Sequence, residues 1–564
     1  MEVTPEKIKE LLVNPGHISS DEYAAVIAQA KKTKRPLFDL LLENNLVKDE
    51  QLGRLLAEDQ GFPFVNLRKE KIDDTIMRTI PEMVSRSRGI IAYAREDNSV
   101  KLAMLDPHDL EIRNFIKKRF GSGVRVFFIT KNDLRQALTR YRPSLKEEYE
   151  QIIKNLKSTS GGDDTEDRLT IKLLDTLLEY GYFSKASDVH IEPYRKKVVV
   201  RFRIDGVMCR VLEIPKDYLE MLLRRLKILA KMRTDEHLAA QDGKFSFKVD
   251  GDSIDVRVSV VPITGGENAV MRLLSSSSRK VDLDSLGLVG GDLEKVKKAI
   301  NNPHGMVLVT GPTGSGKTTT IYEILKIINN DSVHIATIED PVEYNIEGIS
   351  QIQVNPKVNL TFAKGLRAIV RQDPDVIMVG EIRDAETADI AINSAMTGHL
   401  VLSTLHANDA ATTLPRLLEM GVEAFLVAST VRIVIAQRLA RKICEKCRSS
   451  YELGQDELNI VESNPVLKVA LMNRGYKDLR KVMFFKGLGC KTCAGTGYQG
   501  RLGVFEVLAV DDDIKNLIVK KASSEEIVAQ AKQNGMTTMF LDGLNKVLTG
   551  STTLSELLRV VEIN

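Results

Sequence analysis

A glycine-rich loop at residues 311–320 constrains the fold of this chain more than any other segment. It reads Gly-Pro-Thr-Gly-Ser-Gly-Lys-Thr-Thr-Thr, a complete GxxxxGKT phosphate-binding motif. The apolar run 306–309 before it predicts a buried strand, and apolar residues at helical spacing follow it from 321 to 328. A strand, this loop and then a helix is the context that distinguishes the motif from a glycine-rich turn without a ligand. The sequence therefore predicts a nucleoside triphosphate site in an α/β domain.

The residue types of the loop fit a phosphate ligand. Glycines let successive backbone N–H groups turn inward around the β-phosphate, and the N-terminus of the following helix adds positive potential. Lys317 is expected to reach the β- and γ-phosphates, and the Thr318 hydroxyl to bind Mg²⁺. The expected nucleotide-binding residues are Gly311, Pro312, Thr313, Gly314, Ser315, Gly316, Lys317, Thr318 and Thr319.

Length and composition limit the number of domains and the class of protein. A chain of 564 residues is too long for one ordinary core and predicts three or four domains. Its apolar fraction of 43% and charged fraction of 28% are typical of soluble globular proteins, and a net charge of +3 does not favour a nucleic-acid binder. No run approaches the roughly 18 apolar residues of a membrane span, and no signal-peptide pattern opens the sequence. We expect a cytoplasmic protein without a transmembrane segment, which could still dock on a membrane through a partner.

The pattern along the chain predicts four segments. Residues 1–142 read as a helical and mixed module with two helix–turn–helix segments that weakly echo each other. Residues 143–167 are polar, with serine, glycine and aspartate at their end, which predicts a flexible linker. Residues 168–290 read as a sheet with a helix against it, and residues 291–564 contain the phosphate-binding loop.

Strand-like runs alternate with helical stretches in the last segment. The expected strands cover residues 306–310, 334–338, 376–379 and 399–404. Such alternation predicts a parallel sheet covered on both faces by helices. Because ligands bind at the carboxyl edge of such sheets, the side chains that follow these strands are the candidates for chemistry.

Acidic residues and a histidine follow three of these strands. Hydrolysis needs one carboxylate to orient or deprotonate the attacking water and another to hold hydrated Mg²⁺, and we assign Glu343 and Glu381 to these roles. Gly380 stands where an aspartate often follows the third strand, so Glu381 is expected to serve the metal through water. His406, and with less positional support His399, could sense the γ-phosphate. Helix caps or solvated carboxylates, and a hydrogen-bonded structural histidine, are the alternatives.

The order of these segments resembles a known family. Residues 338–343 resemble the aspartate box, residues 376–381 the Walker B box and residues 397–406 the histidine box of the secretion ATPase superfamily, the motors of type II secretion and type IV pilus assembly. The likeness runs from about Leu169 to the C-terminus. It implies a hexameric ATPase that acts on an inner-membrane platform protein, with Glu343 as the catalytic glutamate and the loop lysine and threonine as the phosphate and magnesium contacts.

The middle segment fits the same resemblance. Residues 187–193, Ser-Asp-Val-His-Ile-Glu-Pro, resemble part of the family's domain that swings over the nucleotide and supplies arginine fingers. Such an arginine stabilises charge that develops on the transferring phosphoryl group. The resemblance makes Arg201 and Arg203 the first candidates, with Arg257 and Arg272 behind them. Ion-paired arginines on a strand surface are the alternative.

Four of the five cysteines form two CxxC pairs. Cys444 with Cys447, and Cys490 with Cys493, supply four thiolates, the ligand set of a closed structural Zn²⁺ site with no open position for catalysis. The resemblance supports this interpretation, because the extension and secretion motors carry a tetracysteine insert that retraction motors lack. Unligated buried cysteines are the alternative, and the lone Cys209 is expected in the core.

The N-terminal module resembles the N-terminal domain of the same motors, some of which bind cyclic di-GMP through an Arg-Leu-Gly start in each of two motifs. The matching places here read Lys7-Ile8-Lys9 and Pro36-Leu37-Phe38, without the arginine or the glycine. We therefore expect docking to a membrane protein or a cytoplasmic docking protein rather than cyclic di-GMP binding. The expected fold class is α/β: a RecA-like P-loop ATPase core preceded by a PAS-like α+β domain and this module, with a tetracysteine zinc insert at about 441–505.

These observations predict a cytoplasmic, hexameric Mg²⁺-ATPase motor that powers type IV pilus assembly at the inner face of the membrane. The alternatives are a type II secretion pseudopilus motor, a DNA-uptake or conjugation motor, and a nucleotide-gated scaffold without turnover. Balanced charge disfavours the DNA motor. The carboxylates and arginines disfavour the scaffold, and the long N-terminal module with the cysteine pairs disfavours a retraction motor.

Overall fold

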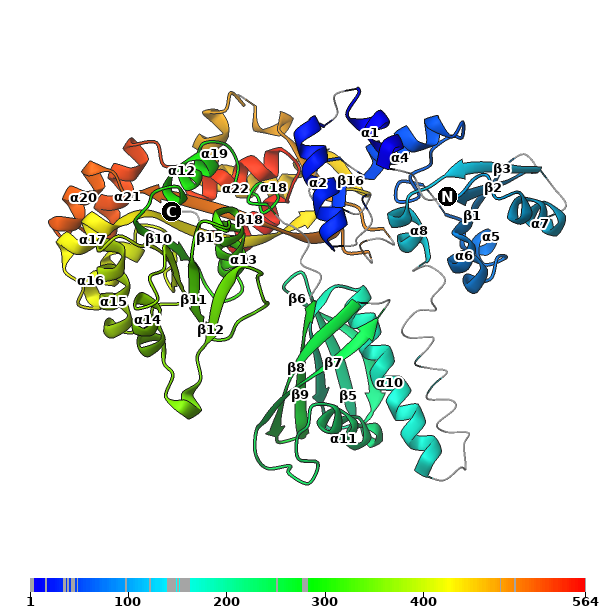
Figure 1. Ribbon diagram of the computed structural model, residues 1–564, viewed down its shortest axis with the longest axis horizontal. Coiled ribbons are helices and arrows are strands. Elements are labelled where there is room, and N and C mark those ends of the chain that lie inside the picture. The colour runs from blue at the N-terminus through cyan, green and yellow to red at the C-terminus, as the bar shows by residue number, and fades with distance from the viewer. Residues whose placement is uncertain are drawn as a thin grey trace. The chain divides into compact units, whose positions relative to one another are not determined.

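The structure is a computed structural model in two compact units, Met1–Lys280 and Val281–Asn564 (Figure 1). The division falls shortly before residue 291, where the sequence suggested that the last domain begins. The structure describes residues 5–15, 18–33, 37, 40–41, 46–47, 49–70, 72–96, 99–120, 123–138, 149, 152, 163–249, 252–275, 282–476, 478–490, 493 and 495–562.

The first unit begins with helices and a small mixed sheet. Its described elements up to residue 138 are α1 (Pro5–Leu12), α2 (Ser20–Thr33), α4 (Asp49–Asp59), α5 (Asp74–Met77), α6 (Glu82–Arg88), β1 (Ile90–Glu96), β2 (Ser99–Met104), α7 (Leu110–Phe120), β3 (Gly123–Phe128) and α8 (Lys131–Leu138). In the described part of this sheet, β2 lies between an antiparallel β1 and a parallel β3. Leu12, Leu52 and Leu56 belong to the cluster that buries the apolar faces of the first helices.

The expected linker at residues 143–167 lies largely outside the described residues. Its last five residues, 163–167, begin helix α10 (Asp163–Phe183) instead of belonging to a linker. The physical reason is their sequence, Asp-Asp-Thr-Glu-Asp, because negative charge in the first turn is favourable at the positive end of a helix dipole.

The middle of the chain folds into an antiparallel sheet with two helices on one face. After α10 its elements are β4 (Ala186–Pro193), β5 (Lys197–Ile204), β6 (Val207–Pro215), the 3₁₀ turn η2 (Lys216–Tyr218), α11 (Leu219–Leu229), β7 (Gln241–Val249), β8 (Asp252–Ile263) and β9 (Gly266–Ser275). The strand order in the described residues is β6-β5-β4-β9-β8-β7. Alternate residues such as Val189, Phe202 and Val256 pack in the core with Leu177 and Leu222 of the helices. The residues between them therefore form a polar second face.

The second unit is a mostly parallel α/β domain. Its elements before the insert are α12 (Gly290–Ile300), β10 (Gly305–Thr310), α13 (Lys317–Ile328), β11 (Ile335–Glu339), β12 (Ile349–Gln353), η3 (Pro356–Val358), α14 (Phe362–Val370), β13 (Val376–Val379), α15 (Ala385–Met396), β14 (Leu400–Leu405), α16 (Thr413–Glu419), α17 (Ala424–Thr430) and β15 (Val431–Ile443). After it come β18 (Tyr498–Ala509), α20 (Asp512–Val519), α21 (Ser524–Gln533), α22 (Met539–Leu548) and α23 (Leu554–Val560).

The sheet of this unit has the order β12-β11-β13-β14-β10-β15-β18 in the described residues. All neighbours are parallel except β18, which runs antiparallel to β15. The predicted parallel sheet is therefore confirmed, with β12, β15 and the antiparallel β18 as strands that the sequence pattern did not reveal. Strand β10, which leads into the glycine-rich loop, pairs with β14 on one side and β15 on the other.

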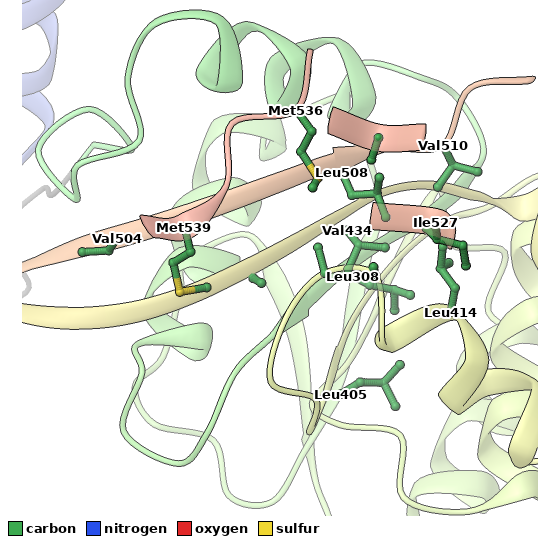
Figure 2. Packing of buried hydrophobic residues seen from close by; sticks show 14 of the residues in the cluster. Leu308, Leu405, Leu414, Val434, Val504, Leu508, Val510, Ile527, Met536 and Met539 are labelled. Carbon is green, nitrogen blue, oxygen red and sulfur yellow. The ribbon is translucent and has the colours of Figure 1, made fainter. Parts of the chain in front are cut away.

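Both faces of the sheet are buried, which explains the unbroken apolar run in β10. Met306 and Leu308 pack into a cluster with α14 to α17 and the C-terminal helices, whereas Val307 and Val309 pack with α12 and α13. Figure 2 shows Leu308 and Val434 close to Leu508 in the first cluster. A strand covered by helices on both faces needs apolar residues at every position rather than at every second one.

The insert between β15 and β18 is a small lobe with the cysteines at its base. It contains β16 (Arg448–Glu452), α18 (Gln455–Ser463), α19 (Pro465–Met472), η4 (Leu479–Lys481) and β17 (Met483–Gly487). Strands β16 and β17 form an antiparallel pair. Cys444 and Cys447 precede β16, and Cys490 and Cys493 follow β17, so the hairpin brings the two pairs together.

Candidate active site

The glycine-rich loop wraps around the carboxyl end of β10. Gly311, Gly314 and Gly316 all have positive φ, at 149°, 78° and 91°. A Cβ at Gly311 would lie 2.6 Å from both Gln437 O and Ser315 Oγ, so only glycine fits this close approach. Gly316 is the N-cap of α13, and the expected nucleotide-binding residues therefore surround the positive end of a twelve-residue helix.

Lys317 and Thr318 occupy the first turn of α13. Lys317 Nζ donates to the carbonyl oxygens of Gly311 at 2.8 Å and Pro312 at 3.2 Å. Partial burial lowers the pKa of Lys317, and the Glu381 charge opposes that shift. Thr318 is exposed, as a hydroxyl that is to bind a metal ion must be.

Two buried side chains that the sequence did not single out hold the loop and the helix in place. Gln437 on β15 is 1% exposed, and its amide donates to Ser315 O at 2.6 Å while its carbonyl oxygen accepts from Thr320 Oγ1 at 2.7 Å. Tyr322 on α13 donates its hydroxyl proton to Glu339 at the end of β11 and accepts from the backbone N–H of Glu343 at 3.3 Å. Neither residue carries a motif signature, because an amide or a phenol becomes informative only when its partners are known.

Glu343 follows β11 in an exposed loop at the carboxyl edge of the sheet. Tyr322 ties its backbone to the helix that follows the phosphate-binding loop. Glu339, the last residue of β11, is buried and bonded to Tyr322, to Thr337 Oγ1 at 2.6 Å and to Gln351 Nε2 at 3.1 Å. Glu339 is therefore a structural carboxylate, whereas Asp340 and Glu343 are the exposed acids that follow this strand.

Glu381 and His406 come together from neighbouring strands. His406 Nε2 lies 3.3 Å from Glu381 Oε2, and Arg383 donates to Glu381 Oε1 at 2.5 Å. Burial raises the pKa of Glu381, but the hydrogen bond and charge of Arg383, together with His406, outweigh it and hold the pKa below its usual value. A carboxylate that stays ionised is the form that interacts with hydrated Mg²⁺.

Gly380 explains why the aspartate of other nucleotide hydrolases is missing from β13. A Cβ at this position would lie 3.3 Å from Glu339 Cα and from Ile338 O, so the strands leave little room for a longer side chain. The acid that we assign to the metal therefore comes one residue later in the chain, at Glu381.

His399 lies at the opposite edge of the sheet from the phosphate-binding loop, and the hypothesis that it senses the γ-phosphate is wrong. It precedes β14, whose first residue pairs with Gly305 at the start of β10, whereas Leu405 at its end pairs with Thr310. Six residues of strand, about 20 Å, separate His399 from the loop. Its Nδ1 lies 2.9 Å from Ser394 O, a structural contact.

The candidate arginines lie on the polar face of the middle sheet, in the first unit. Arg203, Asp188, Arg272 and Arg257 are direct neighbours across β5, β4, β9 and β8. Asp188 is buried and accepts from Arg272 Nε at 2.9 Å, with Arg203 Nε at 3.5 Å. Arg201, two residues from Arg203, forms an ion pair with Glu192. The ion-paired alternative is thus realised for Arg201, Arg203 and Arg272, although their side chains stay partly exposed.

The four cysteine sulfurs converge. All lie within 4.8 Å of one another, with 3.8 Å from Cys444 to Cys490 and from Cys447 to Cys493, and 3.6 Å from Cys490 to Cys493. A tetrahedral Zn²⁺ ion with arms of ~2.3 Å places its sulfurs ~3.8 Å apart, so the spacing fits this ion. Cys209 is only half-buried in β6, which corrects the expectation that it is a core residue.

Comparisons with known proteins agree with this fold and site. The family model of the type II/IV secretion system protein matches residues 163–559, and that of the MshEN domain matches residues 60–148. The type IV pilus assembly ATPase PilB of Myxococcus xanthus is 36% identical over 98% of both chains. The type II secretion system protein E of Xanthomonas campestris is 36% identical over 93% of both chains. The ATPase DotB of Yersinia pseudotuberculosis shares the fold, with a TM-score of 0.50 at 21% identity over 69% of this chain and 92% of that one.

The parallel sheet, the phosphate-binding loop and the acids at its edge define a P-loop ATPase. The chain belongs to the type II/IV secretion system protein family, and it hydrolyses ATP. Within the described residues, no helix combines the length and apolar character that crossing a bilayer requires.

Proposed function

We propose that the protein is a cytoplasmic, hexameric Mg²⁺-ATPase motor that powers type IV pilus assembly through an inner-membrane platform protein. One observation carries this proposal: the phosphate-binding loop, Glu343, Glu381 and His406 meet at one sheet edge in a chain that matches a pilus assembly ATPase over 98% of its length. The balanced net charge of +3 supports a protein substrate over DNA. The PAS-like assignment of the middle domain belongs to this proposal and is supported by its antiparallel sheet with helices on one face.

The residues divide the hydrolytic work by position. Lys317 and the backbone of the glycine-rich loop hold the phosphates, and Thr318 and Glu381 hold Mg²⁺, directly and through water. Glu343 orients and deprotonates the attacking water, a role supported by its exposed position after β11, the strand that pairs with β13. His406, in contact with Glu381, reports the state of the γ-phosphate to the loop that follows β14. Arg201 or Arg203 supplies positive charge to the transition state.

The tetracysteine site holds Zn²⁺ as a structural ion in this proposal. Cys444, Cys447, Cys490 and Cys493 would hold this ion between the end of β15 and the start of β18, at the base of the insert. Four thiolates leave no open coordination position, so the ion has no part in hydrolysis.

The second candidate function is assembly of a type II secretion pseudopilus, which the 36% identity to a type II secretion protein supports equally. Replacing the chromosomal gene by the Lys317→Gln form, in the organism that encodes it, separates the two. Loss of surface pili with normal export of secreted enzymes supports pilus assembly, whereas the reverse pattern supports secretion. Normal pili and normal export together would refute both.

A further inference from the structure

Arg438, on β15 directly after Gln437, is a half-buried cation whose hydrogen bonds go to neutral backbone acceptors. Its Nη2 donates to Asn408 O at 2.9 Å and its Nη1 to Gln437 O at 3.3 Å. Among the described residues it forms no salt bridge, and Asp409, Glu562 and Glu506 act on it only at longer range. A guanidinium has five N–H donors, so three remain for another ligand.

The position of Arg438 is defined by the two loops that frame the nucleotide site. In the register between β10 and β15, Thr310 pairs with Ala436, so Arg438 lies just beyond the end of β10, where the phosphate-binding loop begins. Gln437 faces α13 and binds Ser315 of that loop. Arg438 faces the other side of the strand and binds the loop after β14, two residues beyond His406.

Arg438 and Lys317 place two cations at the same edge of the sheet. The Arg438 charge acts on Lys317, so the two cations lie within electrostatic range of each other. Burial also lowers the pKa of Arg438. Like charges held close together in a partly desolvated site are unfavourable unless an anion joins them, and a planar guanidinium with free donors is well matched to phosphate oxygens.

We propose that Arg438 is a phosphate-binding residue of the nucleotide site, a second side-chain cation that contacts the terminal phosphates of ATP beside Lys317. This inference rests on the assignment of residues 311–319 as the nucleotide site. By binding the phosphates and Asn408 O together, Arg438 would also link the presence of the γ-phosphate to the loop that carries His406.

Binding of a non-hydrolysable ATP analogue and of ADP to the full-length protein tests the inference. Arg438→Gln keeps a hydrogen-bond donor but removes the charge. Arg438→Lys keeps the charge but loses the planar pair of N–H donors of the guanidinium. We expect Arg438→Gln to weaken binding of the analogue roughly 10- to 100-fold, the effect of a charge-assisted hydrogen bond, and binding of ADP less. Arg438→Lys should retain part of the wild-type preference for the analogue over ADP. Arg432→Gln, a half-buried arginine on the same strand beside Gly305, is the matched control and should bind as the wild type does.

Equal affinities of Arg438→Gln and wild type for the analogue would overturn the inference. So would equal weakening of analogue and ADP with a lowered melting temperature, because that pattern means that Arg438 only tethers the loop after β14. Lys317→Gln distinguishes failure of the inference from failure of the site. If Lys317→Gln still binds the analogue with wild-type affinity, the assignment of the nucleotide site is itself wrong.

Discussion

The side-chain amide of Gln437 donates a 2.6 Å hydrogen bond to the carbonyl oxygen of Ser315, in the middle of the phosphate-binding loop. The other end of the same amide accepts from Thr320 on α13. One buried side chain thus fixes the phosphate-binding loop to α13, the helix that follows this loop, before any nucleotide binds. Fixing the backbone N–H groups in advance reduces the ordering cost of binding.

Replacing Gln437 by leucine should therefore weaken nucleotide binding. The change leaves Ser315 O without its buried donor, at a cost of about 1–3 kcal/mol, and frees the loop to move. We expect about 10-fold weaker binding of ATP, measured by equilibrium titration with a fluorescent analogue. Thr320→Val removes only the helix contact and should have a smaller effect. Unchanged affinity in Gln437→Leu would show that the loop holds its shape without this bond.

Glu343→Gln should bind ATP normally and hydrolyse it slowly. The amide is isosteric but cannot deprotonate water, so turnover should fall about 10²- to 10⁴-fold while affinity changes little. Phosphate release and nucleotide titration measure the two effects separately. Glu347→Gln, an exposed glutamate in the same loop, is the control and should retain wild-type turnover. Equal hydrolysis by Glu343→Gln and wild type would transfer the role to Glu381.

The purified protein should contain ~1 Zn²⁺ per chain, measured by plasma mass spectrometry. Cys447→Ser or Cys490→Ser removes a thiolate and should lower both the zinc content and the melting temperature, because the ion closes the insert. Cys209→Ser, outside the cluster, should change neither. Full-length protein without zinc and with an unchanged melting temperature after chelation would identify the cysteines as unligated.

Glu556 predicts acid sensitivity of the ATPase unit. Burial alone would raise the pKa of Glu556, but hydrogen bonds from Arg559 and Arg441 hold it at about 2, against 4.5 for an ordinary glutamate. Because the folded pKa is depressed, the stabilisation is complete above the unfolded pKa and is lost as the pH falls from about 4.5 to 2. The shift corresponds to about 3 kcal/mol at neutral pH. Unfolding free energies of wild type and Glu556→Gln should differ by about this amount at pH 7 and converge in acid; a constant difference would contradict the assignment.

Asp188→Asn should loosen two candidate arginine fingers together. The carboxylate holds Arg272 at 2.9 Å and Arg203 at 3.5 Å, so its loss disturbs both side chains without touching the phosphate-binding loop. We expect about 10-fold lower kcat with near-normal ATP affinity. Asp242→Asn, an exposed aspartate on β7 of the same sheet, is the control. Normal kcat in Asp188→Asn would remove Arg203 and Arg272 from the list of fingers and leave Arg201, whose partner is Glu192.

The difference between His406 and His399 shows how far sequence reasoning reached. Both histidines lie next to the same strand, and the rule that ligands bind at the carboxyl edge favoured His406 without deciding how far His399 lies from the loop. The pairing of Leu405 with Thr310 and of Leu400 with Gly305 answers the question, because parallel strands place all carboxyl ends at one edge. The same rule explains why Glu381 and His406, which follow the adjacent strands β13 and β14, lie in contact.

The sequence by itself determined the phosphate-binding loop, the parallel sheet and the convergence of the four cysteines. These features depend on local residue order, on apolar periodicity and on a short-range ligand pattern, all of which are visible along the chain. Only the tertiary structure decided that Gln437 and Tyr322 hold the loop and its helix, and that Glu339 is buried while Glu343 is exposed. It also decided that the charge of Arg438 acts on Lys317. The physical reason is that these roles come from hydrogen bonds and charges between residues distant in sequence, whose partners are set by strand register and burial.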